Sequence, residues 1–283
     1  MVSGIIAIST GAIFARLADA PSLVIAAYRV GISSLFLLPL VCWKARDELF
    51  RICSKEILLA VFSGFFLALH FAAWITSLSY TTVSNSVVLV STNPLWVGLL
   101  TPLITKEKLK TNTAISIAVS LMGCAIIGGE DFSIGTEALF GDFLALTGGL
   151  CAAFYLLLGR NLRKKLSLIT YISLCYTSAA VILWTMVLIF GIKFYGFSIQ
   201  TNAAFWAMAL IPQLIGHTSY NWALRWFSAG TISVSLLGEP IGATILAFFI
   251  FGEKLTWLKA IGGTFILSAI YIAASSEKKD LGH

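Results

Sequence analysis

The sequence has 283 residues, of which 58% are hydrophobic and only 11% are charged, and its mean hydropathy is +0.92. This composition excludes a water-soluble domain, and it excludes a transmembrane barrel because runs such as VSGIIAISTGAIFA lack the alternation of barrel strands. The net charge of +6 predicts no binding to nucleic acid, since the basic residues are spread among the ends of apolar segments.

Ten apolar segments follow one another along the chain, and we predict that each forms one helix across a lipid bilayer, which needs about 20 apolar residues per crossing. They cover residues 2–18, 21–43, 56–79, 82–104, 112–129, 139–160, 167–192, 203–225, 229–251 and 256–275. The predicted fold is therefore an all-α membrane protein with ten transmembrane helices.

The distribution of Lys and Arg predicts how these helices are oriented. With ten crossings, both termini and every second connection share one side. That side has 14 basic residues: Lys44, Arg46, Arg51, Lys55, Lys106, Lys108, Lys110, Arg160, Arg163, Lys164, Lys165, Arg225, Lys278 and Lys279. The other side has four: Arg16, Lys193, Lys254 and Lys259. Because basic connections stay in the cytoplasm, we predict that both termini are cytoplasmic and that the protein lies in the inner membrane.

The second segment contains an arginine, Arg29, a few residues past its start at Pro21. A charge inside a bilayer is costly and needs a partner or a wet cavity. One interpretation is structural, with the side chain reaching the interface or holding carbonyls and an acidic neighbour. The other is direct contact with an anionic group of a substrate, and the residues alone leave both open.

The third and eighth segments each carry a histidine with a partner four residues later, His70 with Trp74 and His217 with Asn221. This spacing places both members of each pair on one helix face, and Tyr220 stands nearby. Such a face contacts lipid poorly, so we predict that these residues line a central cavity. Imidazole can hydrogen-bond and titrate there, and the aromatic rings can stack or contact a cation. Hydrogen bonding between helices is the alternative.

The fourth and ninth segments contain Asn93-Pro94 and Glu239-Pro240 at matching positions. Proline removes a backbone donor and weakens a helix, so these residues predict bends where a cavity or water can satisfy the backbone. Glu239 is the only carboxylate that we predict well inside a segment. It is either a buried ion-pair partner or a site of proton coupling, and we add it to the predicted cavity.

Glu107 and Glu253 lie at the ends of the same two segments. We predict that they make capping or gating contacts across the symmetry rather than contacts with substrate. Gln213, Trp96 and Tyr28 are secondary candidates for the cavity lining.

Rows of small residues at a spacing of four occur in the fifth and tenth segments. They are Ser116, Ser120 and Cys124, and Ala260, Thr264 and Ser268. Small residues let helices approach closely, so we predict packing seams, with a homodimer contact as the alternative.

The sequence has no phosphate-binding loop of the type G-x-x-x-x-G-K-[ST], no HExxH and no paired metal-ligand cluster. We therefore predict no catalytic residues, no metal and no cofactor.

The stretch NPLWVGLLTPLITKEKL (93–109) has a partial copy, EPIGATILAFFIFGEKL (239–255). Aligning Pro94 with Pro240 gives six identities in sixteen positions without a gap. The copies are five helices apart, which is an odd number, so the second repeat enters the membrane from the opposite side. This predicts two inverted repeats, 1–130 and 139–276, an arrangement typical of secondary transporters.

The two halves resemble EamA domains of the drug/metabolite transporter superfamily. The matching stretches are AAYR (26–29), SIAVSLMGCAIIGG (116–129) and KAIGGTFILSAIYIA (259–273), together with the repeated pair above. The likeness covers essentially the whole chain. It departs at Lys106, where Gly is common, and the second half has no arginine equivalent to Arg29.

These observations predict a secondary active transporter of a small metabolite, working by alternating access around a cavity near the bilayer midplane. The resemblance implies that export of amino acids or related compounds is the commonest expectation. Three alternatives stay open: a passive facilitator, an integral-membrane enzyme using Arg29, His70 and Glu239, and a scaffold with a dry centre.

Overall fold

The fold is known from a computed structural model, which describes residues 2–81, 83–128, 136–252 and 256–281. Within these ranges every regular element is a helix, as predicted. The helices are α1 (Val2–Ser9), α2 (Gly11–Leu17), α3 (Ser22–Lys44), α4 (Arg46–Arg51), α5 (Ser54–Ser77), α6 (Val83–Val90), α7 (Asn93–Ile104), α8 (Thr111–Gly128), α9 (Thr136–Arg163), α10 (Leu168–Ile189), α11 (Ile199–Met208), the π-helix η1 (Ala209–His217), α12 (Thr218–Ala223), α13 (Ala229–Leu236), α14 (Gly238–Phe251) and α15 (Trp257–Leu281).

Among the described residues, seven helical stretches are long and apolar enough to cross a membrane. They are Ser22–Lys44, Ser54–Ser77, Ser86–Ile104, Thr136–Arg163, Leu168–Ile189, Ala229–Phe251 and Trp257–Ser275. Val2–Leu17 and Thr111–Ile126 are shorter apolar helices, and the eighth predicted segment is divided into α11, η1 and α12. The protein is thus an all-helical membrane protein, and the count of ten spans stays a prediction.

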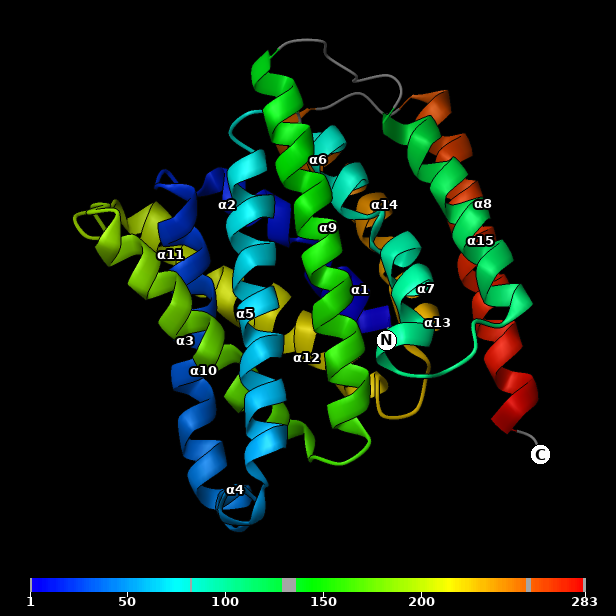
Figure 1. The fold of residues 1–283 in the computed structure, drawn as a ribbon. Helices are drawn as coiled ribbons and strands as arrows, with labels where there is room; N and C mark the ends of the chain where they lie inside the picture. Colours follow the sequence, from blue (N-terminus) through cyan, green and yellow to red (C-terminus); the bar gives the residue numbers. More distant parts are fainter. Residues whose placement is uncertain (1, 82, 129–135, 253–255, 282–283) are drawn as a thin grey trace.

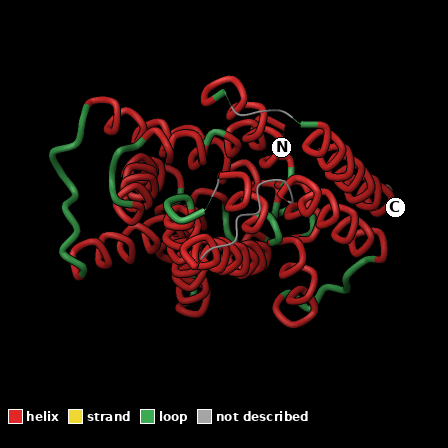
Figure 2. Tube along the Cα trace, turned by 90° about the horizontal axis from the view of Figure 1, so that it is seen from above, coloured by secondary structure: helices red, strands yellow, loops and turns green. Residues whose placement is uncertain are grey.

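The long helices pack in pairs that join distant parts of the sequence. α3 packs along α10, α5 along α9, and α8 along α15, and Figure 1 shows α8 and α15 together at one edge of the molecule. Seen from above, the C-terminus lies at this same edge while the N-terminus lies further in (Figure 2).

The first helix, α1, lies at the centre and packs closely against η1 and α14. Glycines make this close packing feasible. A Cβ atom at Gly216 of η1 would collide with Ile8, and one at Gly242 of α14 would collide with Ser9. Because α1 touches both elements at backbone distance, its last turn can reach the centre of the molecule.

The predicted seam on α8 is buried: Ser116, Ser120 and Cys124 are each at most 2% exposed. At Gly123 the backbones come so close that a Cβ atom would lie 2.7 Å from the carbonyl oxygen of Gly262 on α15. The fifth segment therefore forms a packing seam within the chain.

The corresponding row on α15 differs from the prediction. Ala260, Thr264 and Ser268 are exposed, and the buried face of α15 carries Ile266 and Ala269 instead. The reason is rotational: the spacing of four is shared by every face of a helix, so it does not identify which face meets α8.

Candidate functional site

Four interrupted helices contribute to the centre of the described structure. The first pair, α1 and α2, is separated at Thr10, and α6 and α7 are separated at Ser91 and Thr92. The pair α13 and α14 is separated at Leu237. The last of the four runs from α11 to α12 and changes to the wider π-helical turn over η1. Interrupted helices expose backbone groups that only a protein interior or a wet cavity can satisfy in a membrane.

The predicted bend residues lie directly after two of these interruptions. Asn93 and Pro94 form the first turn of α7, and Pro240 is in the first turn of α14. At this position the missing N–H of proline costs nothing, because the first turn of a helix has no internal acceptor for it. The prolines therefore allow a second helix to start after each interruption.

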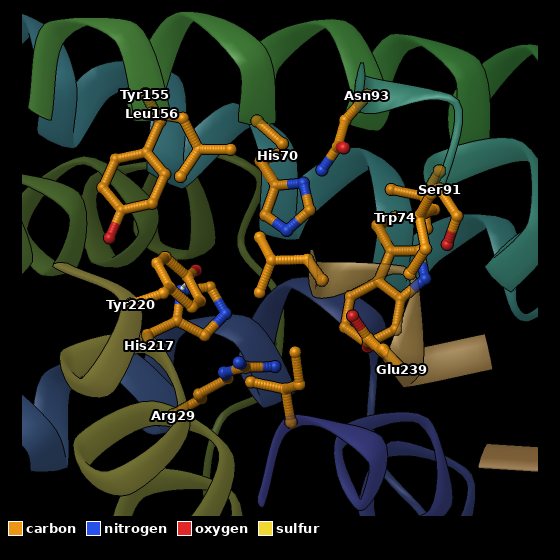
Figure 3. A pocket seen from close by; sticks show the side chains of 15 residues that line it. Arg29, His70, Trp74, Ser91, Asn93, Tyr155, Leu156, His217, Tyr220 and Glu239 are labelled. Carbon is orange, nitrogen blue, oxygen red and sulfur yellow. Dashed lines mark hydrogen bonds between the residues drawn. The ribbon is translucent and has the colours of Figure 1, made fainter. Parts of the chain in front are cut away.

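A cavity of about 40 Å³ lies where these elements meet. This volume holds a few water molecules, since one needs about 10–15 Å³. The lining residues come from α1, α3, α5, α6, α7, α9 and α12 to α14 and from η1, and Figure 3 shows them: Ile8, Arg29, His70, Trp74, Val90, Ser91, Asn93, Ala152, Tyr155, Leu156, His217, Tyr220, Leu236, Leu237 and Glu239. Six of the seven predicted cavity residues are therefore brought together.

Arg29 of α3 is 2% exposed and points into this cavity (Figure 3). Its Nε donates a hydrogen bond of 2.9 Å to Oε1 of Gln213, and its guanidinium carbon lies 4.1 Å from the centre of the Phe71 ring. A cation over an aromatic face is stabilised by the ring quadrupole. Arg29 therefore does not snorkel to the interface, and it is fixed by one amide and one ring.

His70 of α5 is held by a hydrogen bond of 2.9 Å between its Nδ1 and the carbonyl oxygen of Gly148 on α9. A carbonyl only accepts, so Nδ1 carries the proton and Nε2 of the neutral ring is an acceptor. The ring is nearly parallel to that of Trp74, with an angle of 5° and centroids 6.0 Å apart. The predicted pair on one helix face therefore forms one wall of the cavity.

His217 comes from the last turn of η1, and its Nδ1 is hydrogen-bonded to the hydroxyl of Tyr220. The π-helical turn contains Pro212, which lacks an N–H and cannot make the regular helical hydrogen bond. π-Helical turns occur frequently at functional sites. Here this turn supplies both Gln213, the partner of Arg29, and His217, a lining residue.

Asn221 is the predicted cavity residue that does not line the cavity. It is fully buried, and its amide donates to the hydroxyls of Tyr155 and Tyr176 and, at 2.8 Å, to the carbonyl of His217. Its role is to fix Tyr155, which does line the cavity. Sequence reasoning missed Tyr155 because a tyrosine in an apolar run has no distinguishing signal.

Glu239 lies in the first turn of α14, faces the cavity and is shown with Arg29 in Figure 3. The two side chains line the same space, yet no hydrogen bond or ion pair within 4.0 Å joins them in the described structure. Glu239 therefore faces the cavity without a direct ion pair to Arg29, and its role as an ion-pair partner or a site of proton coupling stays a prediction.

Glu107 is remote from the central cavity and makes contacts at the end of the helices. Arg160 and Lys164 of α9 both reach its Oε1, at 3.1 and 2.7 Å. Arg160 also donates to the carbonyls of Leu224 and Arg225. Burial raises the pKa of Glu107, but the hydrogen bonds from Lys164 and Arg160 outweigh this and hold the pKa below its ordinary value.

The remaining candidates lie outside the cavity. Glu253, predicted to gate together with Glu107, is not among the described residues. The hydroxyl of Tyr28 donates to the carbonyl of Phe194, and Trp96 is half-buried beside the core without lining the cavity. In the part of the chain that is described, no three side chains of the metal-binding types cluster closely enough to hold an ion.

Comparison with known proteins gives a consistent result. The model of the EamA-like transporter family matches residues 1–129 and 139–275. Similar sequences include an uncharacterised transporter of Archaeoglobus fulgidus, 26% identical with 71% of each chain covered. Another is the uncharacterised transporter YyaM of Bacillus subtilis, 23% identical over 88% of this chain and 83% of that one. A crystal structure with a TM-score of 0.80 and 15% identity covers 98% of this chain and 96% of its own, so the fold is shared.

Proposed function

Because the chain belongs to the EamA-like transporter family and is a membrane transporter, we propose that it is a secondary active transporter that carries a small metabolite by alternating access. The observation that carries this proposal is that both halves of the sequence contribute residues to the cavity wall. Arg29, His70 and Trp74 come from the first half of the sequence, and His217 and Glu239 come from the second. A relative movement of the halves would therefore open or close the site.

The packing of the helices supports two inverted repeats, 1–130 and 139–276, as the moving parts. Between them, α5 of the first half packs on α9 of the second, and the counterpart of α5, η1, packs on α1 of the first half. Likewise, α7 packs on α9 while its counterpart α14 packs on α1. The pairs α3 with α10 and α8 with α15 each join a helix to its own counterpart. An approximate twofold axis in the membrane plane predicts that each contact between two helices of different halves has such a counterpart, or joins a helix to its own equivalent. Ten spans follow if the short and interrupted helices also cross the bilayer.

We also propose that the termini lie in the cytoplasm and that the membrane is the inner membrane. The excess of Lys and Arg on the terminal side supports this orientation. The contacts of Glu107 with Arg160 and Lys164 lie on that side and join the two halves. They would keep the cytoplasmic end closed in the state described, so the cavity of about 40 Å³ must widen to take a metabolite.

The resemblance to the superfamily supports export of an amino acid or a related compound as the working hypothesis. A homodimer through the outward row of α15 is a secondary hypothesis. An enzyme is not favoured, since Arg29, His70 and Glu239 share the cavity without a hydrogen bond between any two of them in the described structure.

The experiment is counterflow of labelled amino acids in proteoliposomes, with and without a pH gradient. If Glu239 couples transport to protons, Glu239→Gln should abolish accumulation driven by the gradient and retain counterflow, because the amide keeps the size of the side chain but cannot titrate. Glu137→Gln, an exposed carboxylate at the start of α9, is the control. Wild-type transport that is indifferent to the gradient would instead favour the passive facilitator.

A further inference from the structure

Another cavity of the described structure lies beside Glu107, at the end of the helices where this residue meets α9. Its volume is about 380 Å³, which falls within the range of small-molecule sites, about 300 to 1,000 Å³. The central cavity measures only about 40 Å³, and no residue lines both. The central site therefore does not account for this second space, which we call the end cavity.

The walls of the end cavity come from both halves of the chain. The first half contributes Thr101, the connection 107–110 and Thr113, and the second half contributes Arg160, Ser228 and Gly230. The two walls touch, since a Cβ atom at Gly230 would lie only 2.7 Å from Cγ2 of Thr113. Thr101 and Thr113 are buried, at 5% and 2% exposure. Packed helix ends therefore border the space.

The described lining of the end cavity is basic. Lys108, Lys110 and Arg160 are its cations and Glu107 is its carboxylate, so three cations against one carboxylate leave a formal excess of two positive charges. Glu107 is also shared, because Arg160 and Lys164 both contact its Oε1, at 3.1 and 2.7 Å. A cavity whose walls have one sign of charge concentrates ions of the opposite sign. The end cavity therefore attracts anions.

The three cations differ in how they can meet an anion. The guanidinium of Arg160 contacts Glu107, and its Nη1 donates to the carbonyl oxygens of Leu224 and Arg225 at 2.8 and 3.2 Å. It therefore adds a fixed positive charge to the wall. Lys108 and Lys110 are exposed, and a lysine is a point charge with three donors on a flexible stem. These two ammonium groups can therefore turn toward an anion in the cavity.

The charge of the lining selects one kind of anion. A phosphate monoester carries nearly two negative charges at pH 7 and three acceptor oxygens, which match the formal excess of the lining and the donors of the two lysines. A carboxylate brings one charge only. Lysine commonly binds phosphate as a point charge. Basic pockets between membrane helices on the cytoplasmic side also bind anionic lipid head groups.

We propose that the end cavity binds a phosphate monoester, either a soluble ester or a lipid head group, through Lys108, Lys110 and the positive charge of Arg160. Because these residues belong to both halves, the bound phosphate joins the halves. It stabilises the closed arrangement of these helix ends over one in which they separate. The site makes no use of the central cavity, so it is independent of the transport function proposed above.

Thermal unfolding of the purified protein measures this binding, because a ligand that binds only the folded state raises the melting temperature. The soluble probe is glycerol 3-phosphate, titrated in neutral detergent at constant pH and ionic strength, with glycerol and chloride as controls. The lipid probe is phosphatidic acid, a monoester, mixed in increasing fractions into vesicles of phosphatidylcholine. Phosphatidylglycerol, a diester with one charge, is its control. We expect at least one probe to stabilise the protein more than its controls do, and the probe that does so identifies the source.

Variants assign the binding to the end cavity. Lys108→Gln removes one cation from the wall, so it should raise the midpoint of the titration at least about tenfold, because a charge-assisted hydrogen bond is lost. Lys108→Glu, which reverses the charge, should abolish the stabilisation. Lys55→Gln is the matched control and should leave the midpoint unchanged. Lys55 is also exposed near the start of a helix on the side with the basic excess, and it does not line the cavity.

Two results would overturn the proposal. One is that neither glycerol 3-phosphate nor phosphatidic acid stabilises the wild-type protein more than its controls do. The other is that Lys108→Gln and Lys55→Gln shift the midpoint equally, since the effect would then belong to the basic surface in general and not to the end cavity. The melting temperature of each variant without ligand is measured first, and each midpoint is compared with that baseline.

Discussion

Neighbouring polar residues on η1 and α12 have different tasks, although the sequence places them together. His217 and Tyr220 line the cavity, whereas Asn221 points into the packing between helices and donates to Tyr155 and Tyr176. Hydrogen bonds between membrane helices average about 0.6 kcal/mol, with values up to about 1.7. The hydrogen bonds of Asn221 therefore contribute to stability, and its side chain does not line the cavity.

We predict that Asn221→Leu lowers the free energy of unfolding by about 1 to 2 kcal/mol, because it removes the hydrogen bonds from the amide to the hydroxyls of Tyr155 and Tyr176. Thermal unfolding in detergent measures this. Asn202→Leu is the control, since Asn202 is exposed on α11 and bonds only to carbonyls of its own turn. Equal melting temperatures for the two variants would show that the buried amide has no stabilising role.

Single residues were predictable from sequence when they broke the apolar pattern. Arg29 and Glu239 are charges within apolar runs, so the cost of burying them pointed to a cavity. Tyr155 carries no such signal, and its part in the lining depends on which face of α9 meets α5. Asn221 was assigned to the correct helix face, but a spacing of four cannot distinguish the cavity from an adjacent helix contact.

Interruptions are the informative feature at the scale of helices. Pro94 and Pro240 indicated breaks in the fourth and ninth segments, and new helices do start at Asn93 and at Gly238. The π-helical turn η1 was not predicted. Pro212 alone indicates that a helical hydrogen bond is missing, and it does not indicate whether the turn becomes wider or narrower. Hydropathy likewise does not reveal that Val2–Leu17 is divided in two.

Arg160 and Lys164, at the end of α9, contact Glu107, which follows α7. We call these three residues the latch. Arg160→Gln removes the ionic contact of Arg160 with Glu107 and its contacts with the carbonyls after α12, and it leaves that of Lys164. We predict that it opens the cytoplasmic end, raising maleimide labelling of a cysteine placed at Thr101, now 5% exposed. Loss of hydrogen bonds to a charged group predicts an increase of about tenfold. Lys165→Gln breaks only a surface pair with Glu56 and should have little effect.

The pH dependence of this latch has a defined sign. The pKa of Glu107 is lowered in the folded protein, so the contribution of its charge is present above the ordinary pKa of about 4.3 and is lost as the pH falls through the lowered value. Maleimide reacts with the thiolate, so the labelling rate of any cysteine rises with pH. Labelling of the cysteine at position 101, expressed at each pH relative to the same variant unfolded in denaturant, should therefore be the same at pH 6 and pH 8. A change in that interval would assign the latch to a different titrating group.

At the scale of the whole molecule, the helix pairs determine which movement is feasible. Each long helix of one half packs against a helix of the other, so a rocking motion must slide these contacts while the cavity stays between them. The repeated stretch predicts an inverted relation of the two halves, which stays a proposal. The repeat could not predict which end of the cavity is closed. Closure of an end depends on contacts such as that between Asn161 and Ile104, which join positions distant in sequence.

Linking the two halves at the cytoplasmic end tests alternating access directly. Nδ2 of Asn161 donates to the carbonyl of Ile104 at 3.0 Å, so cysteines at these positions can be joined by a short bifunctional maleimide once Cys42 and Cys53, the exposed cysteines, are replaced by serine. The cross-link should remove at least about 90% of counterflow, because the end can no longer open.

A link within one half should not impede the movement. The hydroxyls of Ser22 and Ser79 lie 3.3 Å apart, and both residues belong to the first half. Cysteines joined at these positions should leave counterflow close to that of the unlinked protein, because alternating access moves the first half as a unit. If the two cross-links inhibit equally, the halves do not move as rigid bodies, and if neither inhibits, the cytoplasmic end does not open during transport.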